Sequence, residues 1–256
     1  MKRFLIIFGL VGLSLELVAV DPRLGSVSPP GVQVGTEVEM SFNGSRLEDA
    51  EEILFYKKGF EVVAIEEKKA ASVKAKVRIT AECPLGEHPV RVRTKGGITE
   101  IKTFYVGPFK VVPRVRPKAG EAPQKLALNC TVAGSVPTES QEIFTVDAKK
   151  GQRLSAEIES MRLGRGFYDP YIEILDTKGF ILSRSDDTKL FIQDCYASAV
   201  VPVDGTYTIK VRETSYGAVG LYRMHVGTFA RPTAVYPGGG QAGKELQVKF
   251  IDQATG

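Results

Sequence analysis

Five aspartates are concentrated between residues 169 and 194, namely Asp169, Asp176, Asp186, Asp187 and Asp194. Calcium in proteins takes about six to eight oxygen ligands, commonly carboxylates and backbone carbonyls of loops. Loops at one end of a β-sandwich converge, so we predict Asp169, Asp186, Asp187 and Asp194 as calcium ligands, with calcium as the only candidate cofactor. In the alternative, Asp169 and Asp176 cap turns through their own backbone, and Asp186 and Asp187 lie in a solvated loop.

Signals for catalysis are absent from the sequence. It contains two histidines, His88 and His225, and neither belongs to a His-Glu-x-x-His motif. There is no Gly-x-Ser-x-Gly turn, and the three glycines at 238–240 fall in a turn of a repeat and not in a phosphate-binding loop. His225 stands between Met224 and Val226 as an ordinary strand residue. We therefore predict no catalytic residue and a protein that is not an enzyme.

The three cysteines, Cys83, Cys130 and Cys195, match no zinc-binding pattern. Cys130 and Cys195 fall in the same predicted module, so they are the pair that would form a disulfide in an oxidising compartment. The alternative is three unpaired thiols buried as small apolar residues.

Four aromatic residues could stack on a sugar: Phe167, Tyr168, Tyr171 and Tyr216. They define the carbohydrate-binding alternative, in which they share one face. Core or edge packing is the simpler role for them, and the chain has no tryptophan, which has the largest stacking face.

The elements that must position these residues are strands. Residues 73–79 (VKAKVRI) alternate strictly between apolar and charged, and the same period of two recurs around residues 38–42, 90–93 and 208–212. Such alternation is typical of an antiparallel sheet with one solvated face. Turn-forming pairs such as Asn43-Gly44 and Asp204-Gly205 separate the runs. We predict an all-β fold of two consecutive antiparallel β-sandwiches, the first immunoglobulin-like and the second jelly-roll-like, plus an incomplete third module.

The N-terminus has the pattern of an export signal. Lys2 and Arg3 precede an uncharged apolar run at residues 4–13, which is shorter than the roughly 20 residues that span a bilayer. We predict a signal peptide over residues 1–19 and a secreted or cell-surface protein with no membrane span after its removal. An uncleaved N-terminal anchor, or a buried strand or helix, are the alternatives. The formal charge of +4 is spread along the chain, so nucleic acid is not an expected partner.

Prolines mark the boundary between the two modules. Pro108, Pro113, Pro117 and Pro123 define a segment that suits a semi-rigid connector or an edge strand. The predicted modules are residues 22–108 and 124–229, with a linker at 109–123.

An internal repeat follows the second module. Residues 27–37 (VSPPGVQVGTE) recur without a gap as residues 235–245 (VYPGGGQAGKE), and Phe42 and Phe250 stand at equivalent places beyond them. The shared prolines and glycines specify the turn that enters a first strand. Residues 230–256 are therefore predicted to begin a truncated third module, from a longer array or a prematurely ended product, and to be poorly packed in the isolated chain.

Four motifs follow one another in the first module: residues 27–31 (VSPPG), 35–44 (GTEVEMSFNG), 83–92 (CPLGEHPVRV) and 104–107 (FYVG). In order and type they resemble the entry turn, early strand, late turn and final strand of the immunoglobulin-like IPT/TIG family. The resemblance implies an immunoglobulin-type sandwich.

Five motifs run through the second module: residues 144–154 (FTVDAKKGQRL), 168–179 (YDPYIEILDTKG), 185–187 (SDD), 202–211 (PVDGTYTIKV) and 222–227 (YRMHVG). They resemble the bacterial pre-peptidase C-terminal domain, a jelly-roll-type sandwich, and the order of modules resembles that of large exported Planctomycetes-type proteins. The resemblance implies an attachment or maturation module of the kind that accompanies secreted enzymes.

These patterns predict an exported, non-catalytic protein for surface adhesion, scaffolding or attachment of a partner or substrate. Its expected partner is a cell-surface or extracellular protein or polysaccharide. Two alternatives stay open: a carbohydrate-binding accessory module, and the N-terminal fragment of a larger secreted hydrolase or peptidase.

Overall fold

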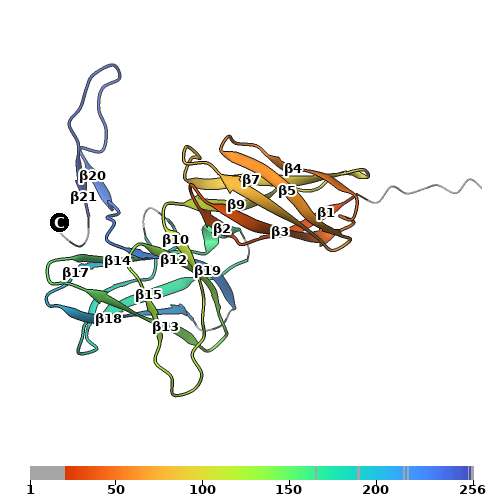
Figure 1. Ribbon diagram of the computed structural model, residues 1–256. Coiled ribbons are helices and arrows are strands. Elements are labelled where there is room, and N and C mark those ends of the chain that lie inside the picture. Colours follow the sequence, from red (N-terminus) through yellow and green to blue (C-terminus); the bar gives the residue numbers. More distant parts are fainter. Residues whose placement is uncertain are drawn as a thin grey trace, which may run out of the picture.

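The computed structural model describes residues 21–254 apart from residues 165, 189, 190, 216, 218 and 253. Figure 1 shows two β-sandwiches and a two-stranded arm that projects beyond the second one. Apart from one 3₁₀ helix, η1 (Met161–Leu163), every regular element in this part of the chain is a strand, so the all-β prediction is confirmed. None of the described elements is a helix long and apolar enough to cross a bilayer. The predicted export signal at residues 1–19 lies outside the described residues.

The first sandwich packs a sheet of order β1-β3-β6-β5 against a sheet of order β2-β9-β7-β4, in which β8 also pairs with β7. The strands are β1 (Arg23–Ser28), β2 (Gly31–Gln33), β3 (Glu37–Ser45), β4 (Ala50–Phe55), β5 (Phe60–Lys69), β6 (Ser72–Ile79), β7 (Gly86–Thr94), β8 (Gly97–Ile98) and β9 (Lys102–Gly107). The apolar members of the alternating run in β6 all face the core. Its basic members form ion pairs on the outer face with Glu37, Glu39, Glu61 and Glu67. One face is therefore dry and the other is solvated, as the alternation predicts.

The second sandwich packs a sheet of order β10-β12-β19-β14-β17 against one of order β11-β13-β18-β15-β16. The strands are β10 (Lys110–Pro113), β11 (Gln124–Leu126), β12 (Cys130–Val136), β13 (Gln141–Ala148), β14 (Arg153–Glu159), β15 (Pro170–Leu175), β16 (Ile181–Ser185), β17 (Tyr196–Val200), β18 (Gly205–Glu213) and β19 (Gly220–Gly227). Its core includes Phe144, Ile174, Tyr207 and Met224, all with no exposed surface. The two sandwiches are distinct units because each has its own hydrophobic core.

Three short edge strands differ from the predicted antiparallel pattern. β2 pairs in parallel with β9, β10 with β12, and β11 with β13. In the last two cases, the chain forms one strand of the facing sheet between the two paired strands. It therefore reverses direction twice, and the second strand of the pair runs parallel to the first. β10 falls in the segment predicted as a linker, residues 109–123. The edge-strand alternative therefore applies to Lys110–Pro113, which belongs to the second sandwich.

The arm has the same strand pairing as the start of the first sandwich. β20 (Ala234–Tyr236) pairs with β21 (Lys249–Ile251), and Val235 lies opposite Phe250. In β1 and β3 the equivalent residues of the repeat, Val27 and Phe42, also lie opposite one another. The repeat in the sequence therefore corresponds to a repeat in strand register.

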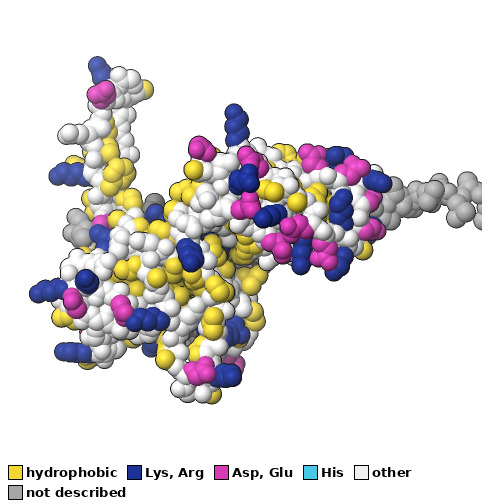
Figure 2. Space-filling model, in the orientation of Figure 1, with side chains coloured by type: hydrophobic (Ala, Val, Ile, Leu, Met, Phe, Trp, Pro, Cys, Tyr) yellow, Lys and Arg dark blue, Asp and Glu magenta, His cyan; other side chains and the backbone are white. Residues whose placement is uncertain are grey.

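The two copies differ in what covers them. Val27 and Phe42 are completely buried, whereas Val235 is 43% and Phe250 71% exposed. Figure 2 shows hydrophobic side chains on the surface of the arm, in contrast to the mixed charges on the first sandwich. An ion pair between Arg153 and Asp252 joins the base of the arm to the second sandwich. The arm is thus anchored at its base, but its apolar side chains lack the layer that buries their equivalents.

We expect the backbone amides of the arm to exchange with solvent far faster than those of β1 and β3. Among the described strands, β20 and β21 pair only with each other. Free energies of local opening near zero are typical of elements with so little coverage. In hydrogen–deuterium exchange measured by mass spectrometry, peptides covering residues 234–251 should be deuterated within about a minute. Peptides covering residues 37–45 should stay protected for a time on the order of hours. Strong protection in the arm would contradict this expectation.

Candidate binding site between the two sandwiches

A cleft of about 540 Å³ lies where the end of the first sandwich meets the outer sheet of the second. The first sandwich and the segment after it contribute Leu85, Gly86, Val106, Gly107, Pro108 and Phe109. The second sandwich and the segment after it contribute Glu157, Glu159, Arg162, Phe191, Arg223, His225, Phe229 and Arg231. A cleft of this volume, lined by both apolar and charged side chains, is a candidate ligand site.

Strand geometry brings the charged groups of the cleft together. In β14 and β19, residues two apart point to the same face of the sheet. The antiparallel register sets Glu157 opposite His225 and Glu159 opposite Arg223. The other face of these strands carries Ile158 and Met224 into the core. The alternation that builds the core therefore also directs both glutamates, Arg223 and His225 toward the first sandwich.

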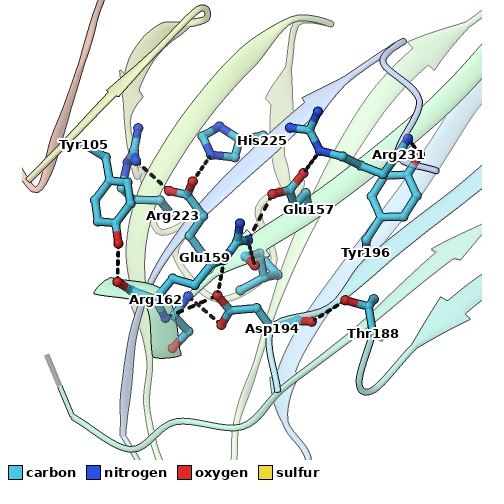
Figure 3. Close-up of polar contacts among 12 residues, drawn as sticks. Tyr105, Glu157, Glu159, Arg162, Thr188, Asp194, Tyr196, Arg223, His225 and Arg231 are labelled. Atoms are coloured by element: carbon cyan, nitrogen blue, oxygen red, sulfur yellow. Dashed lines mark hydrogen bonds and ion pairs between the residues drawn. The ribbon is translucent and has the colours of Figure 1, made fainter. Parts of the chain in front are cut away.

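Glu159 is the centre of one group of polar contacts (Figure 3). Arg223 Nη1 lies 2.6 Å from Glu159 Oε2, and His225 Nε2 lies 3.2 Å from Oε1. His225 Nδ1 is 2.7 Å from the Thr131 hydroxyl, so each ring nitrogen of His225 has a polar partner. Burial on its own raises the pKa of Glu159, but the hydrogen bond from His225 and the charges of Arg223, His225 and Arg162 lower this pKa to about 2.

Arg162 is the centre of a second group (Figure 3). Its Nε donates to Asp194 Oδ2 at 2.6 Å, and its Nη2 donates to Glu157 Oε1 at 3.0 Å. Glu157 Oε2 accepts a further hydrogen bond from Arg231 Nε at 2.6 Å. The Tyr105 hydroxyl of the first sandwich donates to the backbone carbonyl of Arg162. The ion pairs of the second sandwich are thereby joined directly to the first.

Arg223 is the most enclosed of the charged groups, with a side chain only 1% exposed. Its Nε and Nη2 are buried and have no hydrogen-bond partner among the described residues. The backbone of Gly31 lies against the guanidinium, because a Cβ at this position would stand 2.3 Å from Arg223 Cζ. The centre of the Tyr105 ring is 5.6 Å from the same atom. Burial lowers the pKa of Arg223 and the charge of Glu159 opposes this, but an arginine stays protonated at neutral pH.

Of the four predicted calcium ligands, Asp194 is already bound by donors of the protein. Asp194 is completely buried and accepts hydrogen bonds from the backbone of Ser160 and Met161 as well as from Arg162. Burial, then the charges of Asp187, Asp186 and Glu213, raise the pKa of Asp169, so these acidic groups lie near one another. Within the described part of the chain, no three acidic, cysteine or histidine side chains are grouped as metal ligands.

Calcium binding at Asp169, Asp186, Asp187 and Asp194 stays a prediction, for which the loops would have to close around the ion. Asp169 Oδ1 is buried without a partner in the described structure, which leaves one oxygen free to bind a cation. If the site forms, calcium at about 100 times its Kd should add about 2.7 kcal/mol to the stability of the second sandwich. Melting with and without millimolar calcium measures this, and Asp169→Asn should abolish the increase. An identical Tm in calcium and in a chelator would contradict the prediction.

The alternative role for Asp176 is confirmed. Its Oδ1 accepts hydrogen bonds from the backbone of Lys178 at 2.9 Å and of Phe180 at 2.8 Å, so it caps the turn between β15 and β16. An aspartate that bonds backbone two residues onward is a common turn device.

The predicted disulfide between Cys130 and Cys195 is not formed in the structure. Both are free buried thiols in the core of the second sandwich, and Cys83 is a free buried thiol in the first. Burial raises the pKa of Cys130 to about 11, and burial together with the charge of Asp194 raises the pKa of Cys195 well above its ordinary value. Thiols in this state are unreactive.

The three described aromatic residues proposed for sugar binding, Phe167, Tyr168 and Tyr171, do not share an exposed face. Tyr168 is buried in the core, Tyr171 is covered by Arg212, whose Cζ lies 3.9 Å from the ring centre, and Phe167 is 64% exposed. Tyr216 lies outside the described residues. Core packing, the simpler alternative, applies to Tyr168.

The charged residues of the cleft were not predicted as a site. Their one signal in the sequence is that Glu157, Glu159, Arg223 and His225 alternate with apolar residues in two runs far apart in the chain. Alternating charge of this kind also describes a solvated sheet face. Only the pairing of β14 with β19, under the first sandwich, distinguishes a cleft wall from a solvated sheet face.

Comparison with known proteins found limited likeness. No protein-family model matches the chain, and no curated protein matches it. The similar solved structures include Aeromonas hydrophila PliG, a periplasmic inhibitor of g-type lysozyme, at 18% identity over 46% of this chain and 96% of that protein, with a TM-score of 0.31. The pre-peptidase C-terminal domain of Bacillus anthracis collagenase is 15% identical over 44% of this chain and 99% of that domain, with a TM-score of 0.32.

A third structure is SGBP-B of the Bacteroides ovatus mixed-linkage glucan utilization locus, solved with a mixed-linkage heptasaccharide. It is 10% identical over 75% of this chain and 74% of that protein, with a TM-score of 0.28. Scores this low carry no inference about the function of this chain. The resemblance of the first sandwich to the IPT/TIG family stays a prediction.

Proposed function

We propose that this chain is an exported, non-catalytic binding protein in which two β-sandwiches act as one unit and present the cleft between them to a partner at the cell surface. The observation that carries the proposal is that both sandwiches build the wall of the cleft. A site shared in this way requires a fixed arrangement of the two units.

Buried contacts across the junction supply that arrangement. Tyr105 of the first sandwich donates to the backbone of Arg162, and the backbone of Gly31 lies on the guanidinium of Arg223. Separating the sandwiches would expose Arg223 and Tyr105 and remove these contacts. An interface that holds paired, buried charges in one geometry favours a single relative orientation.

The state of the titratable groups supports binding and not catalysis as the role of the cleft. Glu157, Glu159 and Asp194 are each paired with arginine at 2.6 Å. A general acid or base needs a pKa near the working pH, whereas the surrounding positive charges hold the pKa of Glu159 near 2. These carboxylates instead position arginine side chains.

A binding comparison of two variants tests the proposal. Leu85 lines the cleft and is 56% exposed, so Leu85→Trp should fold normally and narrow the entrance. Ile98 is a matched control, because it is 49% exposed on the same sandwich and does not line the cleft. The purified proteins would be screened on a displayed peptide library and on a glycan array.

We expect the native chain and Ile98→Trp to bind the same members, and Leu85→Trp to bind them at least about tenfold more weakly, since filling a pocket removes the ligand's buried contacts. Equal binding by Leu85→Trp would place the binding surface elsewhere. Turnover of a library member would overturn the non-catalytic assignment.

A further inference from the structure

We infer that the arm is a pairing site for the arm of a second copy of this chain, and that the two arms join edge to edge through residues 245–249. No residue of the arm lines the cleft, so this surface is separate from the proposed binding site. Figure 1 shows that the arm projects away from both sandwiches, which leaves room for a second copy beside it. The evidence lies in the differences between the arm and its equivalent in the first sandwich.

The repeat continues beyond the opening turn into a row of apolar residues. At the same offset as the rest of the repeat, the inward-facing residues Val38, Met40 and Phe42 of β3 correspond to Leu246, Val248 and Phe250. Met40 is completely buried, and Val38 is partly buried against the same core. Their equivalents Leu246 and Val248 are 47% and 40% exposed. Residues 245–249 therefore have the pattern of a core-facing strand without the neighbours that cover one.

The neighbour that the arm lacks is a strand on the outer edge of β21. In the first sandwich, residues 37–40 of β3 pair with β6. Their equivalents, residues 245–248, belong to no described strand, and β21 begins only at Lys249. Within the described chain, β21 pairs with β20 alone. The backbone donors and acceptors along such an edge are a template for a further strand.

The side chains of residues 245–249 (ELQVK) are complementary to themselves in antiparallel pairing. With a twofold axis at Gln247, Glu245 of each copy lies opposite Lys249 of the other, and Leu246 lies opposite Val248. The two Gln247 amides face each other, and each can donate and accept a hydrogen bond. Opposite charges at directly facing positions stabilise an antiparallel pair of strands, and like charges destabilise it. A second arm therefore supplies the strand that this edge lacks.

A strand of the β6 type is a poorer match for the same edge. In the first sandwich, Ser41 of β3 faces Lys74 of β6. The arm has Lys249 at the position equivalent to Ser41. A strand like β6 would set a lysine opposite Lys249, whereas a second arm sets Glu245 there. The charge pattern thus favours the arm of a second copy over the remaining strands of a sandwich like the first.

The pairing is expected to be weak, because only a few residues of each chain take part in it. We expect the native chain to be monomeric at about 1 μM and to become increasingly dimeric toward about 1 mM. The rapid hydrogen exchange expected of the arm is that of the dilute monomer. In the dimer, the amides of residues 245–249 acquire partners, so their exchange should slow as the protein concentration rises.

Charge reversal at the two facing positions tests the pairing by sedimentation equilibrium. Glu245→Lys or Lys249→Glu alone sets like charges opposite one another twice, so the Kd of the dimer should rise at least about tenfold. The double variant restores both pairs of opposite charges, and its Kd should lie within about threefold of the native value. A one-to-one mixture of the two single variants should dimerise more strongly than either variant alone, because each then faces opposite charges on the other.

Glu48→Lys and Lys95→Glu are the matched controls. They change the net charge in the same way at exposed residues of the first sandwich. Neither control should alter dimerisation, and their mixture should behave as each does alone. Glu245 and Lys249 are themselves exposed, so the variants of the arm should fold as the native chain does. A native chain that stays monomeric up to about 1 mM would overturn the inference. So would a mixture of the two single arm variants that dimerises no better than its components.

Discussion

Replacing Gly31 with alanine is expected to destabilise the protein by about 3 kcal/mol, because the new methyl group would overlap the buried guanidinium of Arg223. The Cβ would stand 2.3 Å from Arg223 Cζ and 2.5 Å from its Nε and Nη2. The arginine cannot move away without weakening its ion pair with Glu159, whose side chain is only 12% exposed. Urea unfolding of native and variant chains measures the difference.

Gly25→Ala is the matched control. Gly25 also lies in an edge strand of the first sandwich, and its Cβ would meet only the Asn43 carbonyl at 3.4 Å. We expect a change within about 0.5 kcal/mol there, as is usual for substitutions that meet no close neighbour. If Gly31→Ala were as stable as Gly25→Ala, the close packing of the two sandwiches around Arg223 would be refuted.

Replacing Glu159 with glutamine should have the largest effect of any substitution considered, about 3–5 kcal/mol of lost stability. Glutamine keeps the size of the side chain but leaves the positive charge of Arg223 buried without its counter-ion. Glu48→Gln, on an exposed glutamate of the first sandwich, is the control and should change little.

The same pair of variants should differ in pH dependence. The pKa of Glu159 is about 2 in the folded protein against 4.5 for an ordinary glutamate. Between these two pH values the folded protein therefore binds fewer protons at this site than the unfolded chain does. Its contribution of about 3 kcal/mol is therefore present above pH 4.5 and is lost as the pH falls toward 2. Native stability should fall through this window, and Glu159→Gln should fall less. Parallel curves for the two proteins would show that Glu159 has no lowered pKa.

How far the sequence predicts this fold is clearest in β6 and in the arm. The alternation in residues 73–79 was enough to identify a strand with one dry and one charged face, because side-chain direction in a strand depends only on position along it. The repeat of residues 27–37 at 235–245 predicted a second copy of the same opening turn and strand. The structure gives both copies the same register.

The edge strands and the acidic cluster mark where that reasoning stops. Nothing local distinguishes a linker from the edge strand β10, since its hydrogen bonds go to β12, a strand in another part of the chain. Asp194 looked like Asp186 and Asp187 in the sequence, but its neighbours in space are Arg162 and the backbone of Ser160. A carboxylate's role depends on what faces it, and sequence spacing does not contain that information.

The sequence by itself determined the all-β class, the dry and solvated faces of the strands and the repeated opening of a sandwich, because these depend on the order of neighbouring side chains. Tertiary structure alone decided the cleft. Glu159 and Arg223 meet across a sheet although 64 residues separate them, and Tyr105 reaches the backbone of Arg162 from the other sandwich, 57 residues away in the chain. Contacts of this kind arise from strand pairing and from the docking of two units, and those are properties of the folded chain as a whole.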